Sequence, residues 1–288
     1  MSASLSGWKY FTYSLKTGAG YYMSSPGRFF HREALRRLLT PINVSRCYEF
    51  SKTFEELQPV KEDLIFDLSS PKLLSHYLEE KVGCRVVTSD IAFDEVYSWK
   101  SMTEHKKAKP QWLLINGRMI GIKDNSFDKV FSISVLEHIA DNGDAETLKE
   151  LGRILKPGGR LVFTIPLAEE FRTEFSKEDA YDIYGAGQKT YHWSHFYNEN
   201  TIQVKLVKGS GLTLENIYYA YGVGSMIWKK IERLGRLGFP LWILSMMIAK
   251  YGLSEITTQP PVRNDDYYLA AVVVMKKEGK GNDGQGAE

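Results

Sequence analysis

Asp67, Asp90 and Asn116 each end or closely follow a short apolar run in the first half of the chain. A carboxylate can accept hydrogen bonds from two adjacent hydroxyl groups, and an amide oxygen can accept one from an amino group. Asp90 lies 23 residues after Asp67, which is close to the spacing at which α/β folds place a ribose-binding carboxylate. The alternatives stay open: Asp90 can cap the next turn or helix, and Asn116-Gly117 is an ordinary turn dipeptide.

Three histidines could act as general bases. His138 stands in the segment Glu137–Ile139, and His192 and His195 stand in the aromatic segment Tyr191–Tyr197. A histidine near a pocket can take a proton from a hydroxyl group. The structural alternative is that each ring packs locally and makes hydrogen bonds to its neighbours.

Apolar runs of strand length recur with helical patterns between them. Five of them precede residue 170, at 64–67, 85–88, 111–115, 128–134 and 160–165. Continuous apolar strands separated by helices indicate a parallel sheet covered on both faces. Right-handed crossovers then predict a doubly wound α/β fold. Ser70-Pro71 is expected to begin the helix after the first strand, with Ser70 as its N-cap.

The stretches 123–139 and 151–166 read as strand, loop, helix, glycine turn and strand. This order resembles the central part of class I S-adenosylmethionine-dependent methyltransferases, in the small-molecule, methyltransferase type 11-like branch. The resemblance implies a Rossmann-like, mainly parallel seven-stranded sheet with an antiparallel last strand. The runs 212–219 and 267–275 would be its last two strands.

The resemblance also implies a set of cofactor-binding residues for S-adenosyl-L-methionine. Asp90, with Ile91 beside it, would hold the ribose, and Asn116 and Gly117 would lie at the adenine. The remaining positions are at the ends of the first and fourth strands: Asp67, Ser69, Ser70, Lys72 and Ser134.

The loop after the first strand departs from the family pattern. The family has Asp-x-Gly-x-Gly-x-Gly, and this chain has Asp67-Leu-Ser-Ser-Pro-Lys-Leu73. A nicotinamide dinucleotide would need those glycines for close approach of its pyrophosphate, so an oxidoreductase is disfavoured. S-adenosylmethionine has no phosphate. We expect Ser69, Ser70 and the amides after Pro71 to surround its carboxylate, with Lys72 nearby.

The composition and charge of the chain argue against several other classes of protein. The net charge of +2 and the absence of a basic face give no reason to expect a nucleic-acid partner. Cys47 and Cys84 lack metal-ligand spacing and are expected to be free thiols, so no metal site is predicted. No secretory signal is visible near the N-terminus, and a cytoplasmic location is expected.

The chain is expected to divide into an N-terminal helical cap (1–60), a methyltransferase-like domain (61–276) and a disordered tail (277–288). A helical insertion (225–263) would separate the last two strands. Its apolar run is too short to cross a bilayer. The segment is expected to be a lid or a homodimer element buried against protein; the alternative is peripheral membrane contact, with Trp228 and Trp242 at the lipid boundary.

The sequence therefore predicts methyl transfer from S-adenosyl-L-methionine to a small-molecule acceptor, with a hydroxyl oxygen preferred over nitrogen or carbon. The alternative is a non-catalytic relative that kept the fold and acts as a binding or regulatory partner. The altered loop supports this alternative, whereas the presence of Asp90 argues against it.

Overall fold

A computed structural model describes residues 7–24, 31–179, 189–234, 241, 244–256 and 268–279. Its centre is an eight-stranded sheet in the order β3-β2-β1-β4-β5-β10-β8-β9. The strands are β1 (Leu64–Leu68), β2 (Arg85–Asp90), β3 (Gln111–Leu114), β4 (Phe127–Ile133), β5 (Leu155–Ile165), β8 (Thr213–Tyr221), β9 (Ser254–Ile256) and β10 (Tyr268–Lys276).

The pairing is parallel from β3 to β5 and antiparallel beyond it. β1 pairs in parallel with both β2 and β4, whereas β10 runs antiparallel to both β5 and β8. The predicted Rossmann-like fold with an antiparallel last strand is confirmed. The count of seven strands was wrong by one. Within the predicted insertion, Ser254–Ile256 forms β9, which pairs with the otherwise open edge of β8.

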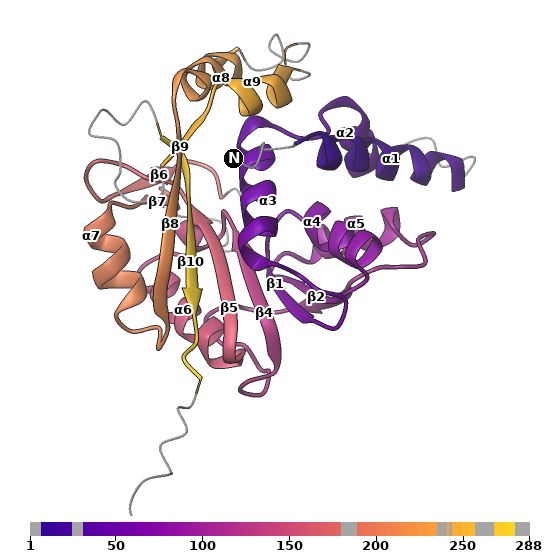
Figure 1. Ribbon diagram of the computed structural model, residues 1–288. Helices are drawn as coiled ribbons and strands as arrows, with labels where there is room; N and C mark the ends of the chain where they lie inside the picture. The colour runs from indigo at the N-terminus through magenta and orange to yellow at the C-terminus, as the bar shows by residue number, and fades with distance from the viewer. Residues whose placement is uncertain are drawn as a thin grey trace, which may run out of the picture.

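Helices cover both faces of the sheet (Figure 1). On one face lie α1 (Trp8–Ser24), α2 (Arg32–Leu39), α3 (Val44–Leu57), α4 (Leu73–Tyr77), helix η1 (Leu78–Val82) and α5 (Phe93–Met102). On the other lie α6 (Gly143–Ile154), α7 (Glu199–Thr201) and helix η3 (Ile202–Val207). Each face has its own buried core, because strand residues alternate between the two.

Two smaller units complete the described fold. A two-stranded ribbon, β6 (Arg172–Ser176) and β7 (Tyr191–Phe196), lies outside the main sheet. The helices α8 (Val223–Arg233) and α9 (Ser245–Tyr251) form a helical pair between β8 and β9. Both helices lie within or next to the predicted insertion; residues 257–263 of that insertion, Trp242 and most of the predicted tail lie outside the described residues.

Candidate functional site

The carboxyl ends of the parallel strands meet at one edge of the sheet, which is where doubly wound folds bind their ligands. Asp90 is the last residue of β2, and Ser69 and Ser134 directly follow β1 and β4. Both serines have a positive φ, 51° and 50°, so the chain turns sharply as it leaves each strand. This edge therefore brings together most of the residues that the sequence proposed for the cofactor.

The carboxylate of Asp67 is fully buried and is used inside the fold. Oδ1 accepts from the backbone N–H of Ser70 at 3.1 Å, and Oδ2 accepts from Thr88 Oγ1 at 2.6 Å and from Ser75 Oγ. These bonds tie the loop after β1 to α4 and to β2. In the family that the sequence resembles, glycines allow this loop to turn. Here the hydrogen bonds of the Asp67 carboxylate hold the loop in place.

Ser70 does not cap the following helix, so that prediction was wrong. α4 begins at Leu73, and its N-cap is Lys72, without a side-chain capping bond. The Ser70 hydroxyl instead accepts from the N–H of Ile133 at 2.8 Å and lies 3.4 Å from the carbonyl of Leu68. It joins the loop to the end of β4, because the buried hydroxyl finds partners on the neighbouring strand.

Lys72 lies 2% exposed beneath the end of β2. Its Nζ donates to the carbonyl of Ser89 at 2.7 Å and forms an ion pair with Asp90 Oδ2 at 2.9 Å. The other oxygen of Asp90 accepts from the N–H of Ala92 at 3.1 Å. A carboxylate offers about four lone-pair positions, so Asp90 retains capacity to accept further hydrogen bonds.

Asn116 and Ile91 are exposed beside Asp90 at this edge of the sheet. Asn116 follows β3, and its side-chain oxygen accepts from the N–H of Arg118 at 3.0 Å, which makes an Asx turn. At Gly117 an added Cβ would lie 2.9 Å from Thr147 Cγ2. The glycine is therefore needed where the loop approaches α6, whichever ligand binds.

A polar cluster that the sequence did not predict lies at the ends of β4 and β5. Glu49 of α3 is 1% exposed, and its Oε1 accepts from Ser134 Oγ at 2.7 Å and Thr164 Oγ1 at 2.9 Å. Arg46, one helical turn earlier, forms an ion pair with Glu49 and donates to Ser134 Oγ at 2.8 Å. The spacing of Arg46 and Glu49 along a helix was the only sequence signal, and it is equally typical of surface pairs.

Glu137 and two of the proposed histidines, His138 and His192, lie together just beyond the end of β4. Glu137 is 3% exposed in helix η2 (Leu136–His138), and its Oε2 has no hydrogen-bond partner. Burial raises the pKa of Glu137 to about 8, with a smaller contribution from the charge of Glu49. His138 Nδ1 lies 2.5 Å from the carbonyl of Trp193, and His192 Nε2 lies 3.0 Å from the carbonyl of Glu137.

His195 joins the same cluster from β7. Its ring lies 4.5 Å from that of His192, centroid to centroid, and its Nδ1 is 2.9 Å from Thr173 Oγ1. Its buried Nε2 has no partner. Burial lowers the pKa of His195 to about 4, and the charge of Lys205 acts in the same direction. Burial also lowers the pKa of His138. Both rings are therefore neutral at pH 7.

The described residues contain no group of three or more His, Cys, Asp or Glu side chains arranged to hold a metal ion. Cys47 and Cys84 are both buried free thiols. The polar groups described at this edge are carboxylates, hydroxyls, imidazoles and the guanidinium group of Arg46.

Residues 69–163 match the family described as "Methyltransferase domain". The matched segment runs from the loop after β1 to near the end of β5, so it includes Asp90, Asn116, Ser134 and Glu137. Over this segment the sequence is similar to that family of methyltransferase domains. That family binds S-adenosylmethionine. No curated protein matches the chain in sequence.

Solved structures share the fold at low identity. A methyltransferase of Methanosarcina mazei is 14% identical with a TM-score of 0.50, and the match covers 77% of this chain and 95% of that one. Coclaurine N-methyltransferase bound to N-methylheliamine is 12% identical with a TM-score of 0.53, covering 79% and 69%. The [4+2]-cyclase SpnF is 14% identical with a TM-score of 0.51, covering 95% and 96%. At such identities the likeness shows the fold alone.

Proposed function

We propose that this methyltransferase domain transfers a methyl group from S-adenosyl-L-methionine to a hydroxyl oxygen of a small molecule. The observation that carries the proposal is the cluster of Glu137, His138, His192 and His195 beside the family's cofactor edge, in which Glu137 Oε2 and His195 Nε2 are buried without a hydrogen-bond partner. The small-molecule ligand of coclaurine N-methyltransferase supports an acceptor of that size on this fold.

The residues at the edge suit the two ends of the cofactor. Asp90 would accept from the ribose hydroxyls, Ile91 would pack on the adenine, and Asn116 would accept from its amino group. Arg46 can hold a carboxylate and Glu49 an ammonium, which are the two charges of the amino-acid end. We assign that end to Arg46, Glu49 and Ser134 in place of the loop amides, because Arg46 and Glu49 bring two complementary charges to the ends of β4 and β5.

When bound, S-adenosylmethionine supplies an electrophilic methyl group. The protein then has to orient the acceptor, exclude water and take up the proton of its hydroxyl group. His138, His192 and His195 are the proposed proton acceptors, and Glu137 is added to them. A neutral imidazole can accept that proton at pH 7, whereas Glu137 becomes a base only as the pH rises through about 8.

A second function is favoured by the loop after β1. Its polar groups are paired with one another, and Lys72 is paired with the carboxylate proposed for the ribose. These contacts support a relative that keeps the fold and binds a partner or a different ligand. The [4+2]-cyclase SpnF illustrates that the fold is found outside proteins described as methyltransferases.

Calorimetric titration separates these two functions. S-adenosylmethionine and S-adenosylhomocysteine should bind, and NAD should not. Asp90→Asn should weaken S-adenosylhomocysteine binding about ten- to a hundred-fold, the usual worth of charged hydrogen bonds. Asp94→Asn, an exposed carboxylate in the first turn of α5, is the matched control and should bind normally. If neither compound binds the wild type, the non-catalytic function is favoured.

The assignment of Arg46 is tested in the same titration. Arg46→Gln should weaken binding about ten-fold or more, because a charged hydrogen bond to the carboxylate is lost. Arg36→Gln serves as control, since that side chain is 62% exposed on α2. Equal affinities of the two variants would remove Arg46 from the site. Transfer from cofactor carrying a carbon-13 methyl group then identifies the acceptor atom, because O-methyl and N-methyl carbons resonate apart.

A further inference from the structure

The outer face of α8 is apolar although no other described element covers it. Val223, Ile227 and Leu234 are 65%, 44% and 50% exposed, and their spacing of four and seven residues puts them on one stripe. Lys230 belongs to the same stripe and is also exposed. The opposite side of the helix carries Trp228, which is fully buried in the core that also contains residues of α1, α2 and α3.

α9 repeats this arrangement. Leu244, which precedes the helix, is 44% exposed, and Met247 and Tyr251 are 47% and 69% exposed at helical spacing. Ser245 and Ala249 on the other side are buried. Each helix thus has one face in the protein core and a second apolar face turned outward. Trp228 therefore does not lie at a lipid boundary, contrary to the alternative considered from the sequence.

The two helices are fixed to each other and to the domain. The N–H of Gly224 donates to the carbonyl of Gly252 at 2.7 Å, and a Cβ on Gly224 would lie 2.6 Å from that carbonyl oxygen. Ser245 Oγ donates to the carbonyl of Ile42 at 2.9 Å, just before α3. The outward faces are therefore presented by a rigid unit, which lowers the entropy lost when a partner binds.

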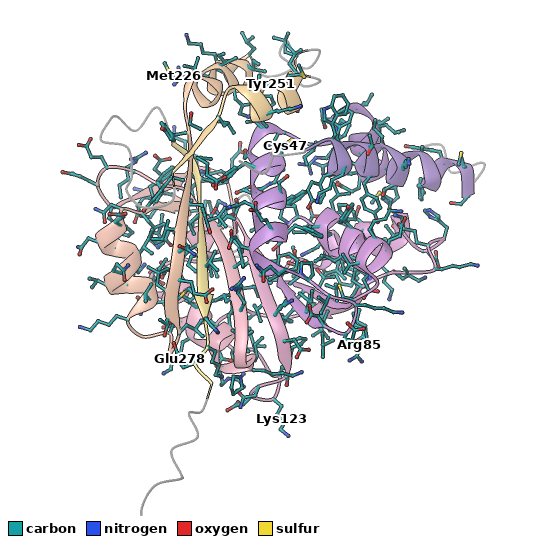
Figure 2. The ribbon with its side chains drawn as sticks, viewed as in Figure 1. Cys47, Arg85, Lys123, Met226, Tyr251 and Glu278 are labelled. Atoms are coloured by element: carbon teal, nitrogen blue, oxygen red, sulfur yellow. The ribbon has the colours of Figure 1, made fainter. Side chains whose placement is uncertain are left out.

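The unit lies at the carboxyl edge of the sheet. Figure 2 shows Met226 of α8 and Tyr251 of α9 at one end of the molecule, and Arg85, the first residue of β2, toward the other. Exposed cations accompany the apolar residues: Lys230 and Arg233 on α8 and Lys250 on α9. The patch is thus apolar and basic at once.

We propose that the outer faces of α8 and α9 dock on the surface of an anionic lipid bilayer. Lys230 decides the choice of partner, because it lies within the apolar stripe. At a bilayer its stem can lie among the acyl chains while its ammonium reaches a phosphate. In a symmetric protein interface the same ammonium would be buried opposite a cationic partner face. None of the described helices is long and apolar enough to cross a membrane, so the contact is peripheral.

This docking is independent of methyl transfer and is tested without cofactor. Full-length protein is sedimented with phosphatidylcholine vesicles that contain or lack phosphatidylserine, at low and at high salt. Binding should require phosphatidylserine and weaken with salt, because screening reduces the attraction between cations and headgroups. Val223→Glu and Met247→Glu should each lower vesicle binding about ten-fold or more.

Val204→Glu is the matched control, since Val204 is 61% exposed on helix η3, and it should bind like wild type. Light scattering of each protein in the absence of vesicles completes the test. No sedimentation of the wild type, equal binding to neutral vesicles, or equal loss in the control would overturn the proposal. So would a wild-type dimer that Val223→Glu converts to a monomer, because the patch would then belong to a second copy of the chain.

Discussion

The two halves of the carboxyl edge differ in how their buried polar groups are paired. On the β1–β2 side, Asp67, Ser70, Lys72 and Asp90 all have partners within the fold. On the β4–β7 side, Glu137 Oε2 and His195 Nε2 are buried without one. A buried polar atom without a partner costs about 1–3 kcal/mol, so the second side carries a cost that a ligand can relieve.

This difference indicates that the β1–β2 side contributes mainly to folding stability and the β4–β7 side mainly to ligand binding. On the β1–β2 side, polar contacts replace the missing glycines and stiffen the loop, so substitutions there should act first on folding. On the β4–β7 side, Glu137, His138 and His195 have shifted pKa values, so substitutions of these residues should act on the pH dependence.

The largest expected effect follows from breaking the Lys72–Asp90 pair. Asp90→Ala leaves a buried ammonium without its counter-ion, which should lower the free energy of unfolding by about 3–5 kcal/mol. Urea denaturation measures this. A strand-end aspartate would be expected from sequence to tolerate the change, because its carboxylate would face solvent; the structure places it against a lysine that is 2% exposed.

The double variant Asp90→Ala, Lys72→Met is the control for that measurement. It removes both charges and should recover most of the lost stability, because a buried ion pair can often be replaced by apolar side chains. A single variant within about 1 kcal/mol of wild type would mean that Lys72 reaches water, since exposed pairs contribute no more than that. The polar groups on the β1–β2 side would then not be buried from solvent as described.

On the other side, Glu137 should make stability fall as the pH rises. Its pKa is about 8 in the folded protein and 4.5 as an isolated group. Between these values the folded chain keeps a proton that the unfolded chain has lost, so unfolding becomes easier with increasing pH and levels off above 8. Relative to Glu137→Gln, the wild type should lose on the order of 4 kcal/mol between pH 5 and 9.

Urea denaturation of wild type and Glu137→Gln at several pH values gives this difference directly, because other titrating groups cancel. Parallel pH profiles of the two proteins would show that the Glu137 carboxylate is solvated. In that case the contrast between the two halves of the edge would be lost.

His195 should give a smaller effect of opposite sign. Its pKa falls from 6.5 to about 4 on folding. Below pH 6.5 the unfolded chain therefore gains a proton that the folded chain does not, and stability decreases as the pH falls toward 4. Relative to His195→Gln, the wild type should lose about 2 kcal/mol between pH 7 and 5. Identical losses in both proteins would place the Nε2 atom in contact with water.

The sequence predicted the sheet better than it predicted the site. The central strands follow from apolar runs, because continuous burial on both faces leaves a strong pattern. The short strand β9 was missed, since a three-residue strand at an edge has no periodicity. The aromatic segment 191–197 was not predicted as a strand, and Tyr191–Phe196 forms β7, which pairs with β6 outside the main sheet.

The site residues show the same limit. Asp90 and Ser134 lie at the carboxyl edge of the sheet, as their positions at the ends of strands predicted, because local position determines where they lie. Arg46 and Glu49 were not found, because α3 reaches the end of β4 only through packing over the sheet, and contacts of that range leave no spacing in the sequence. The partner of Asp90 was missed for a related reason: Lys72 was expected near the methionine carboxylate, and its side chain runs under β2.

The smallest expected effect concerns Asn116, at the proposed adenine end of the site. Asn116 is exposed, and its side chain makes an Asx turn with Arg118 that an aspartate can also make. If it accepts from the adenine amino group, Asn116→Asp should strengthen S-adenosylhomocysteine binding by about 0.5–1 kcal/mol, because the hydrogen bond becomes charge-assisted. S-inosylhomocysteine, which lacks that amino group, should gain nothing. Calorimetry with both compounds decides: an equal gain for the two would reflect general electrostatics, and no gain for either would leave Asn116 as a turn residue.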